Sequence, residues 1–139
     1  MMFKSKLATL MSAIIFTGVA FAAKPMQCPS LASIKAEGLT YAEEIYEGLY
    51  LDYSMSNYDT ETNWFFLMGP IRADSTENAI TEGNKVLATL SGTATPETDE
   101  EGDIVCEYNS GNAELGVYAV HPEAALSPSK MTRILRQGR

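Results

Sequence analysis

The chain has 139 residues, of which 18 are acidic and 10 are basic, so its formal net charge is −8 at neutral pH. The imbalance is concentrated between residues 23 and 122, where 17 acidic residues face four basic ones. Phosphate binding requires a basic surface, so this composition excludes nucleic acid as a partner and is better explained by solubility.

Residues 1–22 are predicted to be a secretory signal peptide. Lys4 and Lys6 precede an uncharged run from Leu7 to Ala22, and Ala20 and Ala22 place small residues where a signal peptidase reads them. An uncleaved anchor is the alternative, but the run is shorter than the ~20 residues that span a bilayer. We therefore expect an exported protein, periplasmic or secreted, with no transmembrane segment after cleavage. The remaining 117 residues suffice for one domain, which we place at 23–122.

Cys28 could be a lipid anchor, a metal ligand, a nucleophile or half of a disulfide. Lipidation is disfavoured because residues 24–27 separate the cysteine from the apolar segment. A structural zinc site is disfavoured because it needs four Cys or His ligands, and the chain has only three such residues, Cys28, Cys106 and His121. The chain also lacks a C-x-x-C motif. Exported cysteine pairs most often oxidise, so we expect a disulfide between Cys28 and Cys106.

The first half of the mature chain predicts a short helix and two strands. Pro29 fits a first helical turn and Gly38 a helix end, which gives a helix over 29–37. Residues 49–55 alternate between apolar and polar side chains, as in a strand with one buried face. Residues 64–71 are apolar on both faces, which is typical of a strand at the centre of a sheet.

The next segment predicts a long helix followed by a loop. Asp74 is a suitable N-cap, and apolar residues recur at helical spacing until Gly92, so we expect a helix over 75–91. Residues 93–103 are polar and acidic and are interpreted as a mobile, solvated loop. A calcium site is the alternative, but the carboxylates do not follow the ligand spacing of an EF-hand.

Two further strands, 103–109 and 114–120, are joined by a turn at 110–112, and Pro122 ends the second. The order helix, strand, strand, helix, strand, strand with short connections predicts an α+β domain. We expect an antiparallel four-stranded sheet with the long helix packed on one face. The disulfide would then tie the first helix to the third strand.

Residues 123–139 are predicted to be a flexible basic tail, in which Lys130, Arg133, Arg136 and Arg139 recur every three residues. A short amphipathic helix that touches membranes is one interpretation. A frayed terminus that partly neutralises the acidic domain is the other, and it is favoured because isolated helices of this length are marginal.

A family resemblance follows from the order of these features: a signal peptide, CPSLASIKAEGL, NWFFLMGPI, an S-x-x-x-A-I helix and a C-x-Y-N strand. The chain resembles, over residues 28–120, a group of small exported proteins from Legionella and its relatives that are mostly catalogued as a domain of unknown function. One named member type is the secreted hemin-binding protein. The resemblance implies the pair Cys28 and Cys106 as the matching disulfide, and it specifies no ligand residue.

Hemin binding needs an axial ligand and an apolar slot for the porphyrin. His121 is the only histidine and the best candidate for the axial ligand, and Trp64, Phe65 and Phe66 are candidates for apolar contacts. Tyrosinate is an alternative axial ligand, and the chain offers seven tyrosines: Tyr41, Tyr46, Tyr50, Tyr53, Tyr58, Tyr108 and Tyr118.

The functional expectation is a small exported binding protein with hemin as the candidate ligand. The alternative is a secreted, host-directed module that binds a protein and no small molecule. An enzyme is not expected, because no catalytic signature is present and the adjacent Glu43 and Glu44 would point to different sides of an element.

The apolar strand over 64–71 raises a separate question about its two faces. If the long helix covers one face of this strand, the other face either exposes an aromatic patch or lies under the first helix.

Overall fold

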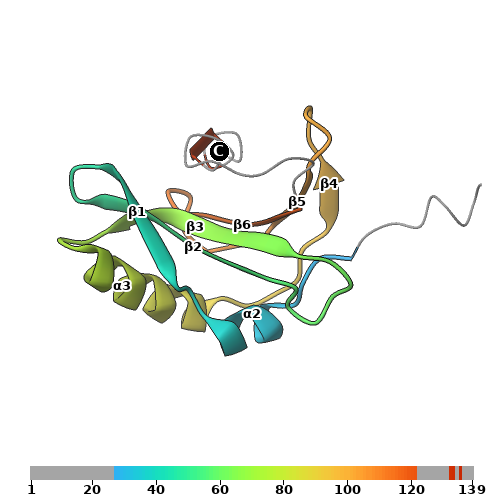
Figure 1. Ribbon diagram of the computed structural model, residues 1–139, viewed down its shortest axis with the longest axis horizontal. Helices are drawn as coiled ribbons and strands as arrows, with labels where there is room; N and C mark the ends of the chain where they lie inside the picture. The colour runs from blue at the N-terminus through green and yellow to red at the C-terminus, as the bar shows by residue number, and fades with distance from the viewer. Residues whose placement is uncertain (1–26, 122–131, 134, 136–139) are drawn as a thin grey trace, which may run out of the picture.

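The computed structural model describes residues 27–121 together with residues 132, 133 and 135 (Figure 1). The predicted signal peptide and most of the basic tail lie outside these residues. The elements of the domain are α2 (Leu31–Glu37), β1 (Tyr41–Tyr46), β2 (Leu49–Ser56), β3 (Trp64–Arg72), α3 (Thr76–Thr89), β4 (Pro96–Thr98), β5 (Ile104–Glu107) and β6 (Gly116–His121).

All strands form one antiparallel sheet in the order β1-β2-β3-β6-β5-β4. The α+β class, the antiparallel pairing and the central place of β3 are confirmed. The prediction of four strands is wrong, because the sheet has six. β1 was not predicted because its residues are exposed or half-buried and lack an apolar face. β4 was not predicted because it has only three residues and begins with a proline.

Both helices are capped by their own sequence. The Ser30 hydroxyl accepts a hydrogen bond from the Ser33 backbone N–H, and Gly38 ends α2 with a φ of 76°. In α3 the N-cap is Ser75, whose hydroxyl accepts from the Asn78 N–H at 3.1 Å, in place of the expected Asp74. The predicted long helix is therefore confirmed with its ends shifted by one or two residues.

The two helices lie on the same side of the sheet, below it in Figure 1. There they enclose a core in which Trp64, Phe66 and Met68 of β3 are completely buried. Helix residues Leu31, Ile34 and Leu87 belong to the same cluster. The alternative that the first helix covers the opposite face of the sheet is therefore wrong.

The predicted disulfide is confirmed between Cys28 and Cys106, with an S–S distance of 2.09 Å and Cα atoms 5.9 Å apart. It fastens the residues that precede α2 to β5, across 78 positions of sequence, which should stabilise the fold by about 4 kcal/mol. No helix within the described residues has the length and apolar character needed to cross a membrane.

Candidate functional site

His121, the expected axial ligand, lies half-buried at the end of β6. Its Nδ1 is 3.1 Å from the backbone oxygen of Asn63 and 3.4 Å from the hydroxyl of Thr62. A carbonyl oxygen only accepts, so the bond to Asn63 requires Nδ1 to carry the proton. In the neutral ring, the lone pair then resides on Nε2, which is the nitrogen that a metal would take.

The aromatic residues predicted to accompany His121 do not share one surface with it. Trp64 lies beside the histidine, with ring centroids 5.8 Å apart, but it is completely buried and its indole N–H donates to the Thr60 hydroxyl. Phe66 is also completely buried and packs edge-to-face on Tyr108. Phe65 is half-buried on the opposite face of the sheet. The four residues therefore form no single ligand slot.

The tyrosines offer few exposed alternatives. Tyr41 and Tyr46 have 58% and 66% of their surface exposed. Burial raises the pKa of Tyr58 and Tyr108, so the phenolate form that would ligate a ferric ion is disfavoured at both. In addition, Tyr108 donates its hydroxyl hydrogen to the backbone oxygen of Pro29.

The β2–β3 loop borders a surface cleft of about 660 Å³ next to the disulfide. Tyr58 and Asp59 adopt positive φ angles of 46° and 61°, and Asp59 accepts a hydrogen bond from Ser33 of α2 at 3.0 Å. The cleft is lined mainly by hydroxyl and carboxylate side chains, from Ser30, Ser33, Asp59, Thr60, Glu61 and Thr62. This lining is too polar for the apolar slot that a porphyrin requires.

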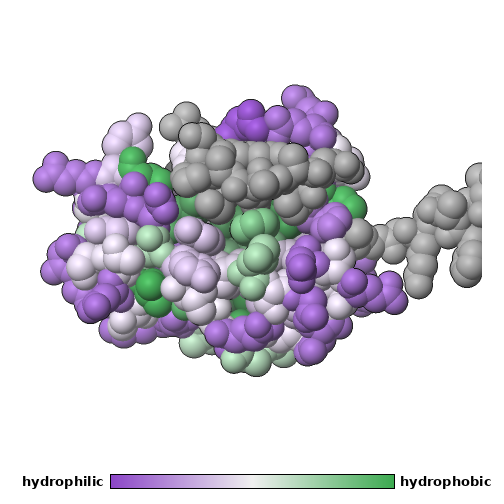
Figure 2. Space-filling model, in the orientation of Figure 1, coloured by the Kyte–Doolittle hydropathy of each residue, from purple (hydrophilic) through white to green (hydrophobic). Residues whose placement is uncertain are grey.

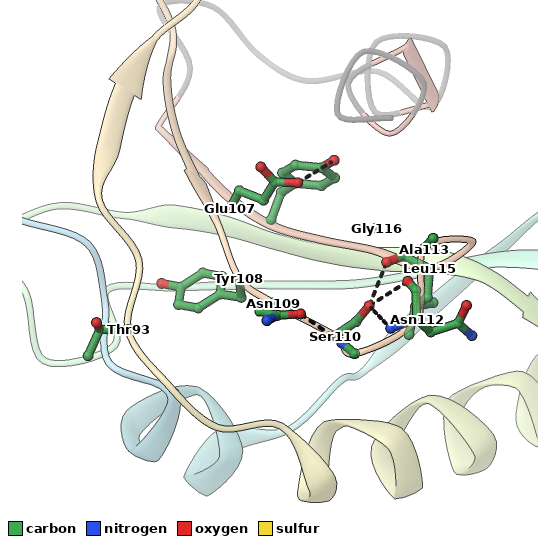
Figure 3. A pocket seen from close by; sticks show the side chains of 11 residues that line it. Thr93, Glu107, Tyr108, Asn109, Ser110, Asn112, Ala113, Leu115 and Gly116 are labelled. Atoms are coloured by element: carbon green, nitrogen blue, oxygen red, sulfur yellow. Dashed lines mark hydrogen bonds between the residues drawn. The ribbon is translucent and has the colours of Figure 1, made fainter.

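A second cleft of similar volume lies at the β5–β6 turn (Figure 3). Its polar groups largely satisfy one another: the Ser110 hydroxyl lies 2.8 Å from the Asn112 oxygen and 2.9 Å from the Leu115 oxygen, and it also accepts from the Asn112 N–H. A turn that uses its own donors and acceptors in this way has little left for a ligand.

The acidic loop brings three carboxylates together. Atoms of Asp99, Glu101 and Asp103 lie within 4.8 Å of one another, and Asp99 Oδ1 accepts from the backbone N–H groups of both other residues at 2.9 Å. Glu101 also forms an ion pair with Arg133 at 2.6 Å. Sequence analysis weighed a calcium site in this loop and set it aside because the carboxylates do not follow the ligand spacing of an EF-hand. The acids at positions 99, 101 and 103 do alternate, and the structure brings them together.

The face of the sheet that points away from the helices, here called the open face, carries two cross-strand rows. Directly paired residues of antiparallel strands share a face. The strand register therefore aligns one row of Tyr41, Tyr53, Leu67, Tyr118 and Glu107, and a second row of Met55, Phe65, Val120, Val105 and Glu97.

Exposure divides the open face into two parts. Leu67, Tyr118 and Val120 are almost completely buried, whereas Tyr41 and Met55 are 58% and 57% exposed. Tyr41 stacks on Tyr53 with ring centroids 5.4 Å apart. Figure 2 shows green hydrophobic residues in the upper part of the molecule, bordered by purple hydrophilic side chains. Sequence analysis placed Met55 on the apolar face of residues 49–55 but did not place Tyr41 in a strand. Its expectation that only the apolar face of this strand is buried is wrong, because Met55 is 57% exposed whereas Asp52 and Ser54 on the other face are buried.

Asp52 is the one buried acid of β2, and it faces the helices. It is completely buried, and neither carboxylate oxygen has a hydrogen-bond partner among the described residues. Burial raises the pKa of Asp52 to about 7. A Cβ atom added to Gly83 of α3 would lie 1.9 Å from Asp52 Oδ2, so the glycine provides the space for the carboxyl group. This acid is enclosed and cannot reach a ligand at the surface.

Comparison with known proteins identifies one family. A family model described as a domain of unknown function, DUF4949, matches residues 27–134, which is most of the chain. Neither the curated proteins nor the solved structures gave a significant match.

Proposed function

We propose that this chain, which belongs to the DUF4949 family, is an exported binding protein that engages a protein partner through the open face of its sheet. The observation that carries the proposal is the surface formed by the exposed side chains of Tyr41 and Met55 and the half-buried Tyr53, which neither α2 nor α3 covers. Aromatic residues and methionine are enriched at protein interfaces and supply large contact area at low entropic cost. Export is supported by the signal-like residues 1–22 and by the disulfide.

The partner that fits this surface is a basic, apolar segment. Glu43 pairs with Leu51 across β1 and β2 and thus shares the open face, and Glu97 and Glu107 end its two rows. Because the domain is strongly acidic, cationic partners gain from charge complementarity, which speeds association and discriminates against acidic competitors.

A displayed library of random peptides tests the proposal. We expect peptides rich in Lys or Arg and in aliphatic residues to be enriched on the mature protein. They should fail to bind a Met55→Asp variant but should still bind a Thr81→Asp variant, since Thr81 lies on α3 at the other side of the sheet. Enriched peptides that bind both variants equally, or no enrichment at all, would contradict the proposed role of the open face.

Hemin binding is a second candidate, and the orientation of His121 favours it. The Nδ1 contact with the Asn63 carbonyl fixes the tautomer that presents a lone pair at Nε2, an arrangement common in metal-ligating histidines. Hemin titration should then give a saturable Soret shift that is weakened in a His121→Ala variant and retained in a Tyr46→Phe variant. A spectrum equal to that of free hemin at all ratios would dismiss this candidate and leave the protein-binding proposal intact.

A further inference from the structure

Asp52 lies in the interface between β2 and the middle of α3, on the helix side of the sheet (Figure 1). The strand register places Ala42 of β1 and Met68 of β3 beside it on the same face. The Asp52 side chain is completely buried, and neither carboxylate oxygen has a hydrogen-bond partner among the described residues. A carboxyl group in such surroundings is tolerated in its neutral, protonated form and opposes burial once it ionises.

The titratable groups of the surrounding elements do not compensate a charge on Asp52. The charged side chains of α3 are exposed: Glu77, Glu82 and Lys85. The side chains that β3 presents to the helices do not titrate: Trp64, Phe66, Met68 and Ile71. The helix face of β1 adds Glu44, which is exposed, and that of β2 adds Tyr50, whose pKa is raised chiefly by burial. Burial is accordingly the cause of the raised pKa of Asp52.

The backbone of α3 lies directly against the carboxyl group. A Cβ atom added to Gly83 would be 1.9 Å from Asp52 Oδ2 and 2.9 Å from Leu39 Cδ1. An ionised carboxylate needs hydrogen bonds, and at this position water is the group that can supply them. Water reaches Asp52 only when a neighbouring element moves away.

Of the elements around Asp52, α3 is the one that can move without breaking the sheet. β1 and β3 are joined to β2 by backbone hydrogen bonds, whereas α3 packs on the sheet through side chains. Next to Gly83, the Asn84 amide accepts from the Leu39 N–H at 2.9 Å and donates to the Leu39 oxygen at 3.2 Å, and water can replace both bonds. Movement is confined to the central turns, because Lys35 donates to the Leu90 oxygen at the end of the helix.

We infer that Asp52 is a proton-controlled latch for α3: the protonated acid keeps the central turns of the helix docked on β2, and its ionisation releases them. Release gives water access to the helix-side core around Met68 and Leu87. The docked state binds the proton more tightly than the released state, so docking is favoured at low pH and weakens as the pH rises toward 7. The latch acts on the helix face and does not depend on the proposed binding role of the open face.

Hydrogen exchange of the full disulfide-bonded mature chain, measured by mass spectrometry between pH 5 and 8, tests the latch. Dividing each exchange rate by the intrinsic rate at that pH gives the equilibrium constant for local opening. We expect this constant to be larger for residues 76–89 than for β3. In α3 it should rise by up to about tenfold per pH unit between about pH 5 and 7, and level off above pH 7, where Asp52 is ionised in both states.

An Asp52→Asn variant should lose this pH dependence in α3, because asparagine does not titrate. Glu82→Gln is the matched control, since it removes an exposed carboxyl group from the same helix and should keep the wild-type profile. If Asp52→Asn does not fold, Asp52→Ser serves for the same comparison. A pH-independent opening of α3 in the wild-type chain, or a pH dependence retained without Asp52, would overturn the inference. Equal opening constants for α3 and β3 at every pH would also overturn it, because the helix would then open only with the whole domain.

Discussion

The two faces of the sheet are built from alternate residues of the same strands, but they differ in how far other parts of the chain cover them. On the helix face, Trp64 and Phe66 are completely buried under two capped helices, one of which is adjacent to the disulfide. On the open face, Leu67 is buried while Met55 remains more than half exposed. Burial under two helices commits the helix face to stability, whereas the open face keeps the exposed surface for which we propose a binding role. Adjacent residues of β3 can therefore have unrelated roles.

The largest expected effect comes from a pair of neighbours on β3. Phe66→Ala should destabilise the protein by about 3–5 kcal/mol, because it leaves a cavity in the helix-side core. Phe65→Ser, on the half-buried open face, should cost only about 1 kcal/mol. Urea denaturation monitored by the fluorescence of Trp64 measures both. Equal losses would mean that the open face is as much a part of the core as the helix face.

A second prediction concerns the close approach of α3 to β2. Gly83→Ala should destabilise the fold by about 1–3 kcal/mol, because the new methyl group overlaps Asp52 Oδ2 and crowds Leu39 Cδ1. In an Asp52→Ala background the same change should be much less costly. A double-mutant cycle of unfolding free energies measures this coupling, and additive effects would show that the carboxyl group is not what limits space at Gly83.

The buried acid on the helix face also predicts a pH dependence of stability. The pKa of Asp52 is raised to about 7 in the folded state and is about 3.9 in an unfolded chain, so the folded state retains the proton longer. The resulting stabilisation is complete below about pH 4 and is lost as the pH rises toward 7, with a slope of at most about 1.4 kcal/mol per pH unit.

Thermal melts of the wild-type chain and of Asp52→Asn across this range isolate the contribution of Asp52. Asparagine does not titrate, so the difference in melting temperature between the two proteins should change steadily between about pH 4 and 7. A constant difference would show that Asp52 does not retain its proton on folding.

The smallest expected effect on stability comes from the surface ion pair between Glu101 and Arg133. Glu101→Gln removes the ion pair with Arg133, and because both side chains are about half exposed the loss of stability should be about 0.2–1 kcal/mol. The loss should shrink further at high salt. Glu97→Gln is the matched control on the adjacent strand. A loss well above this range would show that the pair is shielded from water more than the exposure of its two side chains indicates.

The elements that could be predicted from the sequence are those with a strong apolar period or a covalent restraint. The α3 helix, the central strand β3 and the pair Cys28 and Cys106 were all predicted, because each depends on local pattern or on redox chemistry. β1 was not, because its stability comes from pairing with β2 and not from an apolar face of its own. Strands of this kind become recognisable only once their neighbours are known.

The candidate site was less predictable because it depends on which side of the sheet each helix takes. The period-two alternation of a strand places Phe65 and Phe66 on opposite faces of the sheet, but it does not predict which of the two faces the helices. The buried position of Leu135 was equally inaccessible, since it depends on the glycine at position 116 and on packing between distant segments. Asp52 occupies a polar position in the alternating pattern of residues 49–55, which predicts an exposed side chain, so the sequence held no sign of its complete burial.

The position of β1 and β4 at the two margins of the sheet has a consequence for aggregation. An unpaired strand edge is a template for edge-to-edge association between molecules, and folded proteins avoid leaving one unprotected. In β1 the margin carries Glu43 and Glu44, whose charges repel a second copy of the same acidic edge. β4 is only three residues long and starts with Pro96, which has no backbone N–H to donate. Both margins are thus protected against fibrous self-assembly, and the open face can present aromatic surface without a neighbouring strand edge that recruits further copies.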